Sequence, residues 1–424
     1  MRRMLPCVLA LSLPAQALAG DDDLTALAAS TTLDTPALVA QLLQGLALTT
    51  GLGAKREVRI HEQDRRQLAD IFRKLIAHQY PGTRLELMGQ AFSLLRLLPT
   101  GHNLREEAVR VYQAQVSGYY DPYTSSLVLL RDSDSAQRMP ILQHELTHAL
   151  QDQNYGLAHM LDRAVTDEDH ALALQGALEG QAVVAMFSGP PREAQEDSLA
   201  LKELAADGVL DKNDVAALAE MAKDSGSLSS LLQSASAIDA SAYLQAQLSF
   251  PYQEGTRFIE ALMKKSSLAD TVRRTMSQPP QSTKQVLYPH TYLAGELPSV
   301  VPEVAVPGWS QTFATTVGAL NIRTLLGGAS EVPAQWRGDR VFLFERSRAA
   351  AVVWVSQWES SEGAAAFTHA YANVLGRECT RNGLTFHCAG RSAVLARSDR
   401  TVTFFGDLAD ADLPVFAAAV GTKP

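Results

Sequence analysis

Long hydrophobic runs are absent from this sequence of 424 residues. A transmembrane helix needs roughly 18 consecutive apolar residues, and none is found after the first 20 positions, so we expect no membrane span in the mature chain. The G-x-S-x-G elbow of serine hydrolases is also missing, and there are only three cysteines. A nucleophilic serine or cysteine mechanism therefore has little support.

Basic residues are outnumbered by acidic ones. The sequence has 37 lysines and arginines against 46 aspartates and glutamates, with a formal net charge of −9. An acidic surface favours solubility and repels the phosphates of nucleic acids. We therefore expect a soluble protein with no nucleic-acid partner.

Residues 1–20 have the pattern of a secretory signal peptide. Arg2 and Arg3 form a basic start, residues 4–13 are apolar, and Ala17-Leu18-Ala19 provides a small-x-small cleavage signal. Removal of this segment takes away two positive charges and changes the net charge from −9 to −11. We therefore expect an exported protein that is periplasmic or extracellular.

The two cysteines beyond the signal peptide, Cys379 and Cys388, lie at the ends of a short predicted hairpin. An oxidising compartment favours a disulfide between them, and a metal site that includes His387 is the alternative. A type I′ turn at Asn382-Gly383 would set the two cysteines out of register. A type II′ turn at Gly383-Leu384 would place them opposite each other, and we expect this turn if the bridge forms.

The most informative motif is an H-E-x-x-H sequence that runs from His144 to His148. Apolar residues at helical spacing around it predict a helix. Four residues make just over one helical turn, so both imidazoles project from one side and can share a metal ion. Glu145 lies about 100° round the helix, where it can reach a metal-activated water. This layout is typical of a zinc hydrolase, and it predicts one Zn²⁺ per chain with Glu145 as the general base.

A third metal ligand is expected downstream, because catalytic zinc usually has three protein ligands and a water. Glu179 is the candidate, since it interrupts an otherwise apolar predicted helix over residues 171–187. The alternative is a glutamate on a solvated face. Apolar neighbours on both sides favour burial, however, and a buried carboxylate needs a partner.

The oxyanion of a tetrahedral intermediate needs a hydrogen-bond donor besides the metal. The candidates are aromatic and imidazole side chains in two loop-like segments, namely Tyr119, Tyr120, Tyr288, His290 and Tyr292. Each of them also fits an ordinary core or rim position. We single out Tyr120, Tyr288 and His290 as possible oxyanion- or substrate-binding residues.

The chain is expected to have an α+β fold in three parts. These are an N-terminal helical segment at 21–54, a mainly helical metallopeptidase domain with a small sheet at 55–304, and a C-terminal α+β domain of unknown role at 305–424. A polar, low-complexity stretch at about 190–240 indicates a helical insertion in the middle part.

Local patterns predict the elements of the two larger parts. In the middle part we expect a tight turn at 118–124, a break at 250–255 within a helix at 242–265, strands at 56–60 and 125–130, and helices at 63–78, 85–98 and 104–116. The second strand precedes the H-E-x-x-H helix, so it is either an ordinary sheet strand or one that pairs with an extended substrate. In the last part we expect strands at 341–345, 350–358, 384–388, 392–397 and 401–406 and helices at 361–375 and 413–420.

Several of these segments together resemble a family of exported bacterial zincin-like proteins of the gluzincin type. The motifs that carry the resemblance are Gly118-Tyr-Tyr-Asp-Pro-Tyr-Thr124, His144-Glu-Leu-Thr-His-Ala-Leu-Gln-Asp-Gln153, Leu178-Glu-Gly-Gln-Ala182, Phe250-Pro-Tyr-Gln-Glu-Gly255 and Pro279-Pro-Gln-Ser-Thr283. They cover roughly residues 55–300. The resemblance implies a zincin-like fold with His144, His148 and Glu179 as zinc ligands.

Two positions depart from the pattern of that family. Gln181 stands where relatives have an acidic residue, and Tyr288 stands where they have a histidine before the proline. An acidic residue beside the third ligand supports it through a hydrogen bond. Its replacement by glutamine puts zinc affinity or turnover in question, but not the fold.

The function that we predict is an exported zinc metallopeptidase that acts on peptide or protein substrates. The main alternative is a catalytically inactive zincin-fold protein that serves in binding or assembly in the periplasm. Both Gln181 and the separate C-terminal part are compatible with that alternative. A metal-dependent hydrolase of non-peptide amides is the third possibility.

Overall fold

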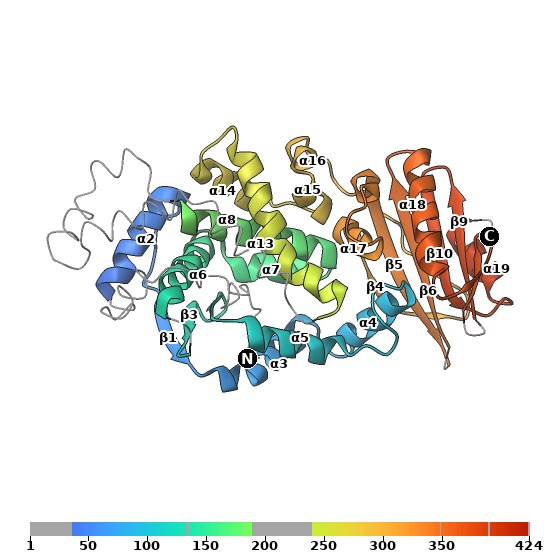
Figure 1. Cartoon of the computed structure of the whole chain (residues 1–424), viewed down its shortest axis with the longest axis horizontal. Helices are drawn as coiled ribbons and strands as arrows, with labels where there is room; N and C mark the ends of the chain where they lie inside the picture. The colour runs from blue at the N-terminus through green and yellow to red at the C-terminus, as the bar shows by residue number, and fades with distance from the viewer. Residues whose placement is uncertain (1–35, 133–134, 189–239, 348, 389–390, 423–424) are drawn as a thin grey trace.

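The computed structural model describes residues 36–132, 135–188, 240–347, 349–388 and 391–422 (Figure 1). In these ranges the chain forms an α+β fold with fourteen α-helices and two sheets. The signal peptide expected at 1–20 lies outside the described residues, as does the expected insertion up to residue 239. No described helix has both the length and the apolar character that crossing a bilayer requires.

The first part of the chain combines helices with a small sheet. Its elements are α2 (Pro36–Thr50), β1 (Arg59–Gln63), the short 3-10 helix η1 (Arg65–Gln67), α3 (Leu68–Gln79), α4 (Arg84–Leu94), α5 (Leu104–Gln115), β2 (Gly118–Asp121) and β3 (Ser126–Leu130). The three helices expected between residues 63 and 116 are therefore confirmed, with shifted ends. The strand expected at 56–60 begins three residues later than predicted.

The segment at 118–124 is not one tight turn, as its composition suggested. Gly118–Asp121 pairs with β3 as strand β2, and only residues 122–125 form the turn. Asp121 stabilises that turn, because its side chain accepts hydrogen bonds from the backbone N–H and the hydroxyl of Thr124 and from the backbone N–H of Tyr123. The two tyrosines before Asp121 favour a strand once a partner is present.

The small sheet has the strand order β1-β3-β2. β1 runs parallel to β3, and β2 runs antiparallel to it with Tyr120 opposite Leu127. Since β3 has a partner on each side, it cannot pair with a substrate, which corrects one of the two roles considered for residues 125–130. The edge strand next to the H-E-x-x-H helix is β2.

A group of helices follows the small sheet. These are α6 (Ser135–Tyr155), α7 (Leu157–Ala164), α8 (Glu168–Phe187), α13 (Ala242–Met263), α14 (Leu268–Ser277), α15 (Thr283–Leu287) and α16 (Pro289–Leu293). The break expected at 250–255 is wrong, because α13 continues through Pro251. Tertiary packing outweighs the proline here. α13 lies against α8 at glycines, and a Cβ atom at Gly255 would lie 2.2 Å from the carbonyl oxygen of Gly176.

The last part of the chain forms a seven-stranded antiparallel sheet in the order β4-β5-β6-β10-β9-β8-β7. Its elements are β4 (Ser310–Thr315), α17 (Gly318–Leu325), the 3-10 helix η2 (Val332–Gln335), β5 (Trp336–Arg346), β6 (Ala349–Trp358), α18 (Ser361–Leu375), β7 (Thr380–Asn382), β8 (Thr385–Cys388), β9 (Arg391–Ser398), β10 (Thr401–Leu408) and α19 (Leu413–Val420). The bounds predicted for α18 and α19 are confirmed residue for residue. β4 and α17 were not anticipated.

Both faces of the large sheet are covered. On one face, Trp354 and Phe404 share a continuous apolar core with Phe92 of α4, Tyr243 of α13 and Phe367 of α18. The other face packs against α19 and the segment around Trp309. Figure 1 shows the helical part at one end of an elongated molecule and the sheet at the other, with α4 reaching across to the sheet.

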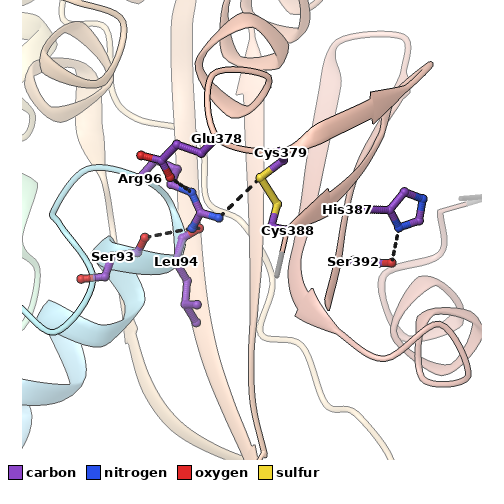
Figure 2. The surroundings of a disulfide bond; sticks show 8 residues. All are labelled: Ser93, Leu94, Arg96, Glu378, Cys379, His387, Cys388 and Ser392. Carbon is purple, nitrogen blue, oxygen red and sulfur yellow. Dashed lines mark hydrogen bonds and ion pairs between the residues drawn. A yellow bond between two sulfur atoms is a disulfide. The ribbon is translucent and has the colours of Figure 1, made fainter. Parts of the chain in front are cut away.

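Cys379 and Cys388 form a disulfide at the ends of the β7–β8 hairpin, with their Cα atoms 4.7 Å apart. Thr380 pairs with His387, so the two-residue turn is Gly383-Leu384, and Gly383 has a φ of +63°. This is the register that we expected if the bridge formed. Figure 2 shows Arg96, in the loop after α4, beside the disulfide and in an ion pair with Glu378.

Candidate metal centre

Three side chains converge between α6 and α8. His144 and His148 extend from α6 and Glu179 from α8, and their ligand atoms all lie within 4.8 Å of one another. Nε2 of His144 lies 3.0 Å from Oε2 of Glu179 and 3.2 Å from Nε2 of His148. The structure therefore brings together all three residues that the sequence predicts as metal ligands.

The two helices hold these side chains in an apolar setting. Leu142, Leu146 and Leu150 place α6 in the same buried cluster as the apolar residues of α8. Almost all of α8 from Leu172 to Met186 is buried, so Glu179 is not on a solvated face. His144, His148 and Glu179 are 1%, 0% and 3% exposed. A carboxylate buried to this degree requires a cationic or metal partner.

Electrostatics within the cluster favour charge on two of the three groups. Burial acts to raise the pKa of Glu179, but the two histidines outweigh it and hold this pKa at about 2. Burial acts to lower the pKa of His148, but chiefly Glu179 outweighs it and raises this pKa to about 9. A positive charge is therefore stabilised between the side chains, which is the charge that a bound cation would supply.

Glu145 lies beside this cluster and is completely buried. Neither of its carboxylate oxygens has a hydrogen-bond partner of normal geometry in the described part of the chain, and the nearby backbone N–H of Tyr120 favours the carboxylate only weakly. Burial raises the pKa of Glu145 to about 8. An unpartnered buried carboxylate next to three metal-ligand atoms fits a site that holds a metal ion and a water.

Tyr252 of α13 is a functional candidate that sequence reasoning did not single out. Its side chain is 4% exposed, and its ring centroid lies 6.2 Å from that of His144. Its hydroxyl has no hydrogen-bond partner of normal geometry among the described residues. Burial, aided by the carboxylates of Glu179 and Glu145, raises the pKa of this hydroxyl well above its usual value. Tyr252 therefore stays protonated and can donate a hydrogen bond.

The tyrosines of β2 have other partners. The hydroxyl of Tyr120 donates to Asp152 at 2.8 Å, and that of Tyr119 donates to Gln63 at 3.1 Å. The side chain of Tyr120, proposed from sequence as an oxyanion or substrate donor, is therefore engaged at the far end of α6. Its backbone N–H, not its hydroxyl, is the group near Glu145.

The candidates around α16 also have contacts of their own. The Tyr288 ring lies 6.4 Å from that of His290, and the charges that act on its hydroxyl are those of Glu331, Arg323 and Glu254. His290 is exposed. Tyr292 donates its hydroxyl to the backbone carbonyl of Gln278 at 2.7 Å. None of these contacts involves His144, His148 or Glu179.

Comparison with known proteins bears on a different part of the chain. Residues 306–414 match a family model described as a domain of unknown function, DUF8575. The match covers the seven-stranded sheet with α17 and α18 and contains none of the three candidate ligands. No curated protein matches the chain. No solved structure matches it either.

Proposed function

We propose that the protein is an exported zinc metallopeptidase of the zincin-like, gluzincin type. His144, His148 and Glu179 would hold one Zn²⁺, and Glu145 would be the general base. The observation that carries this proposal is the unpartnered, buried carboxylate of Glu145 beside three convergent ligand atoms. Two histidines and a glutamate are a common ligand set for catalytic zinc.

The chemistry divides between the metal and the chain. Zinc, when bound, supplies a Lewis acid that polarises the scissile carbonyl and lowers the pKa of water to about 7. Glu145 would accept a proton from the attacking water and pass it to the leaving amine. Tyr252, on a different helix from Glu145, would donate a hydrogen bond to the developing oxyanion, because its hydroxyl stays protonated.

An extended peptide is the substrate shape that suits the neighbouring sheet. In the described residues β2 pairs only with β3, and its backbone N–H at Tyr120 lies near Glu145. A peptide that lay along β2, on the side away from β3, would run past the base. The side chains of the centre are at most 4% exposed, so substrate access requires the surrounding elements to separate.

The burial of the centre favours one second candidate, a zincin-fold binding or assembly protein without peptidase activity. In that role the metal would stabilise the fold, and Glu145 would have no catalytic function. The disulfide between Cys379 and Cys388 supports export in either case, because such bonds persist in oxidising compartments.

Metal analysis of the purified mature protein tests the proposed site. We expect about one zinc per chain in the wild type and a clear loss in Glu179→Ala. His170→Ala is the matched control, because His170 is a partly buried residue of the same helix. Burial lowers its pKa, and the charges that act on this pKa are those of Asp167 and Arg163 and not those of the centre. Freshly purified wild type without zinc would overturn the proposal.

The variant Glu145→Gln separates the two candidate functions. We expect it to keep its zinc, because Glu145 is not one of the three ligands, and to lose about 100-fold or more in peptidase turnover for want of a general base. Zinc binding with no peptidase activity in the wild type, and an unchanged biological role in Glu145→Gln, would favour the binding protein instead.

A further inference from the structure

A chain of buried hydrogen bonds links the metal centre to α14. Nδ1 of His148 lies 2.8 Å from Oε1 of Gln151. Nε2 of Gln151 lies 2.9 Å from Oε1 of Gln181, and Nε2 of Gln181 lies 2.8 Å from the hydroxyl of Thr275. All four side chains are at most 1% exposed. We call these four residues the amide relay.

Two backbone carbonyls fix the direction of every hydrogen bond in the amide relay. The hydroxyl of Thr275 lies 2.8 Å from the carbonyl oxygen of Thr271, which can only accept, so the hydroxyl donates there and accepts from Gln181. At the other end, the amide nitrogen of Gln151 donates to the carbonyl oxygen of Leu178 at 3.1 Å. The amide oxygen of Gln151 must therefore face His148, and Nδ1 of His148 must carry a proton.

We propose that Gln181 and Thr275 are positioning residues, which act through Gln151 to hold His148 with its Nδ1 protonated and its Nε2 directed to the metal. This inference rests on the proposed metal centre. A ligand histidine commonly donates its second ring N–H to a fixed acceptor, and such an acceptor sets both ring orientation and affinity. Here the acceptor is a neutral amide that is itself held by two further residues.

The amide relay also explains how glutamine can stand at position 181. A carboxylate there would accept from both Gln151 and Thr275, so the Thr275 hydroxyl would have to leave the carbonyl of Thr271. It would also add a negative charge two residues from Glu179, in the same buried helix. Gln181 supports His148 without that charge. His144 has no corresponding support, because its Nδ1 lacks a partner in the described structure.

Two threonines of α14 provide a matched test. Thr275→Val removes a hydroxyl that belongs to the amide relay, and Thr271→Val removes one that does not, since the Thr271 hydroxyl bonds to Ser266. Both residues are 1% exposed and lie one helical turn apart. Zinc affinity would be measured by competition with a chelator of known affinity. In the metal-free protein, exchange of the His148 ring Nδ1 proton would be followed by NMR with ¹⁵N-labelled histidine, assigned by its loss in His148→Asn.

Thr275→Val is expected to bind zinc about 10-fold more weakly and to exchange the ring proton faster, whereas Thr271→Val changes neither. Gln181→Met, which interrupts the amide relay at its centre, should have a larger effect, and Thr275→Ser should restore wild-type behaviour. Equal effects of the two valine variants on both measurements would overturn the inference. The two proposals can also fail separately. If the wild type binds no zinc but Thr275→Val exchanges the His148 ring proton faster than the wild type, the amide relay is upheld and the metal centre is overturned.

Discussion

Gly180 of α8 and Gly255 of α13 are in direct backbone contact, because a Cβ atom at Gly180 would lie 2.2 Å from the carbonyl oxygen of Gly255. Gly180 is the neighbour of Glu179, and Tyr252 lies three residues before Gly255 on α13. The close approach of the two backbones therefore sets the position of Tyr252 relative to Glu179 and the two histidines.

Gly180→Ala is expected to destabilise the protein, since the added methyl group meets backbone that cannot move aside. Overpacking of this kind costs about 1–3 kcal/mol or more. Gly45→Ala is the control, because Gly45 lies within α2 and a Cβ there would meet no atom within 4 Å. This control should gain about 0.5–1 kcal/mol from helix propensity. Urea unfolding of both variants checks the prediction, and shifts in the same direction would contradict it.

Tyr252→Phe should lower peptidase kcat by about 100-fold, because one donor to the oxyanion is lost. Zinc content should change little, since the hydroxyl is not one of the three ligands. KM should change little as well, since Tyr252 is not part of β2, along which the peptide would lie. The control is Tyr243→Phe, which alters an equally buried tyrosine of the same helix that packs against Phe92 of α4. Steady-state kinetics on all three proteins distinguish the roles, and equal losses in both variants would rule out a specific role for Tyr252.

The ionisation of Glu168 should lower the stability of the protein as pH rises from about 4.5 to 7. Burial raises the pKa of Glu168 from 4.5 to about 7, against the opposing effects of Arg84 and Tyr80. Because the folded-state pKa is the higher one, folding favours the protonated form. The contribution of Glu168 to the free energy of unfolding is fully present below the pKa of the unfolded state. It is lost as pH rises through the pKa of the folded state, and the loss is on the order of 3 kcal/mol.

Glu168→Gln isolates this contribution, because the amide does not titrate. The difference in free energy of unfolding between variant and wild type should grow in favour of the variant between pH 4.5 and 7, and stay constant above that. Chemical denaturation across this range measures it. Parallel pH profiles for the two proteins would show that Glu168 has an ordinary pKa.

Reduction of the disulfide between Cys379 and Cys388 should destabilise the protein by about 3 kcal/mol, because the bridge closes a loop with a sequence separation of 9. Zinc content should not change, since the hairpin belongs to the seven-stranded sheet, whereas the three candidate ligands lie on α6 and α8. Unfolding with and without reductant measures the loss. A variant with serine at both positions should be insensitive to reductant.

The convergence of His144, His148 and Glu179 was predictable from sequence because the information is local. The spacing of His144 and His148 within one helix fixes their common direction, and the apolar neighbours of Glu179 indicate its burial. The bounds of α18 and α19 were also predictable locally, since each helix contains a run of alanines, which favour helix. Each of these inferences needs only a few consecutive residues.

Features that depend on contacts between distant segments were not predictable in the same way. α13 continues through Pro251 because it packs against α8, and β2 forms because β3 is beside it. Tyr252 was missed for the same reason, although Gly176 and Gly180, four residues apart on α8, were a signal of close helix packing. From sequence, Gln181 was interpreted only as the loss of an acidic residue beside Glu179. Its hydrogen-bond partner Thr275 lies 94 positions later in the chain and could not be inferred.

The apolar core under the large sheet crosses the boundary of the segment that sequence comparison delimits. Residues 306–414 match one family model, yet Trp354 and Phe404 of this segment share their core with Phe92 and Tyr243. Tyr371 also donates its hydroxyl to the carbonyl of Leu95. The segment that the family model delimits thus shares its inward-facing core with helices that lie outside it.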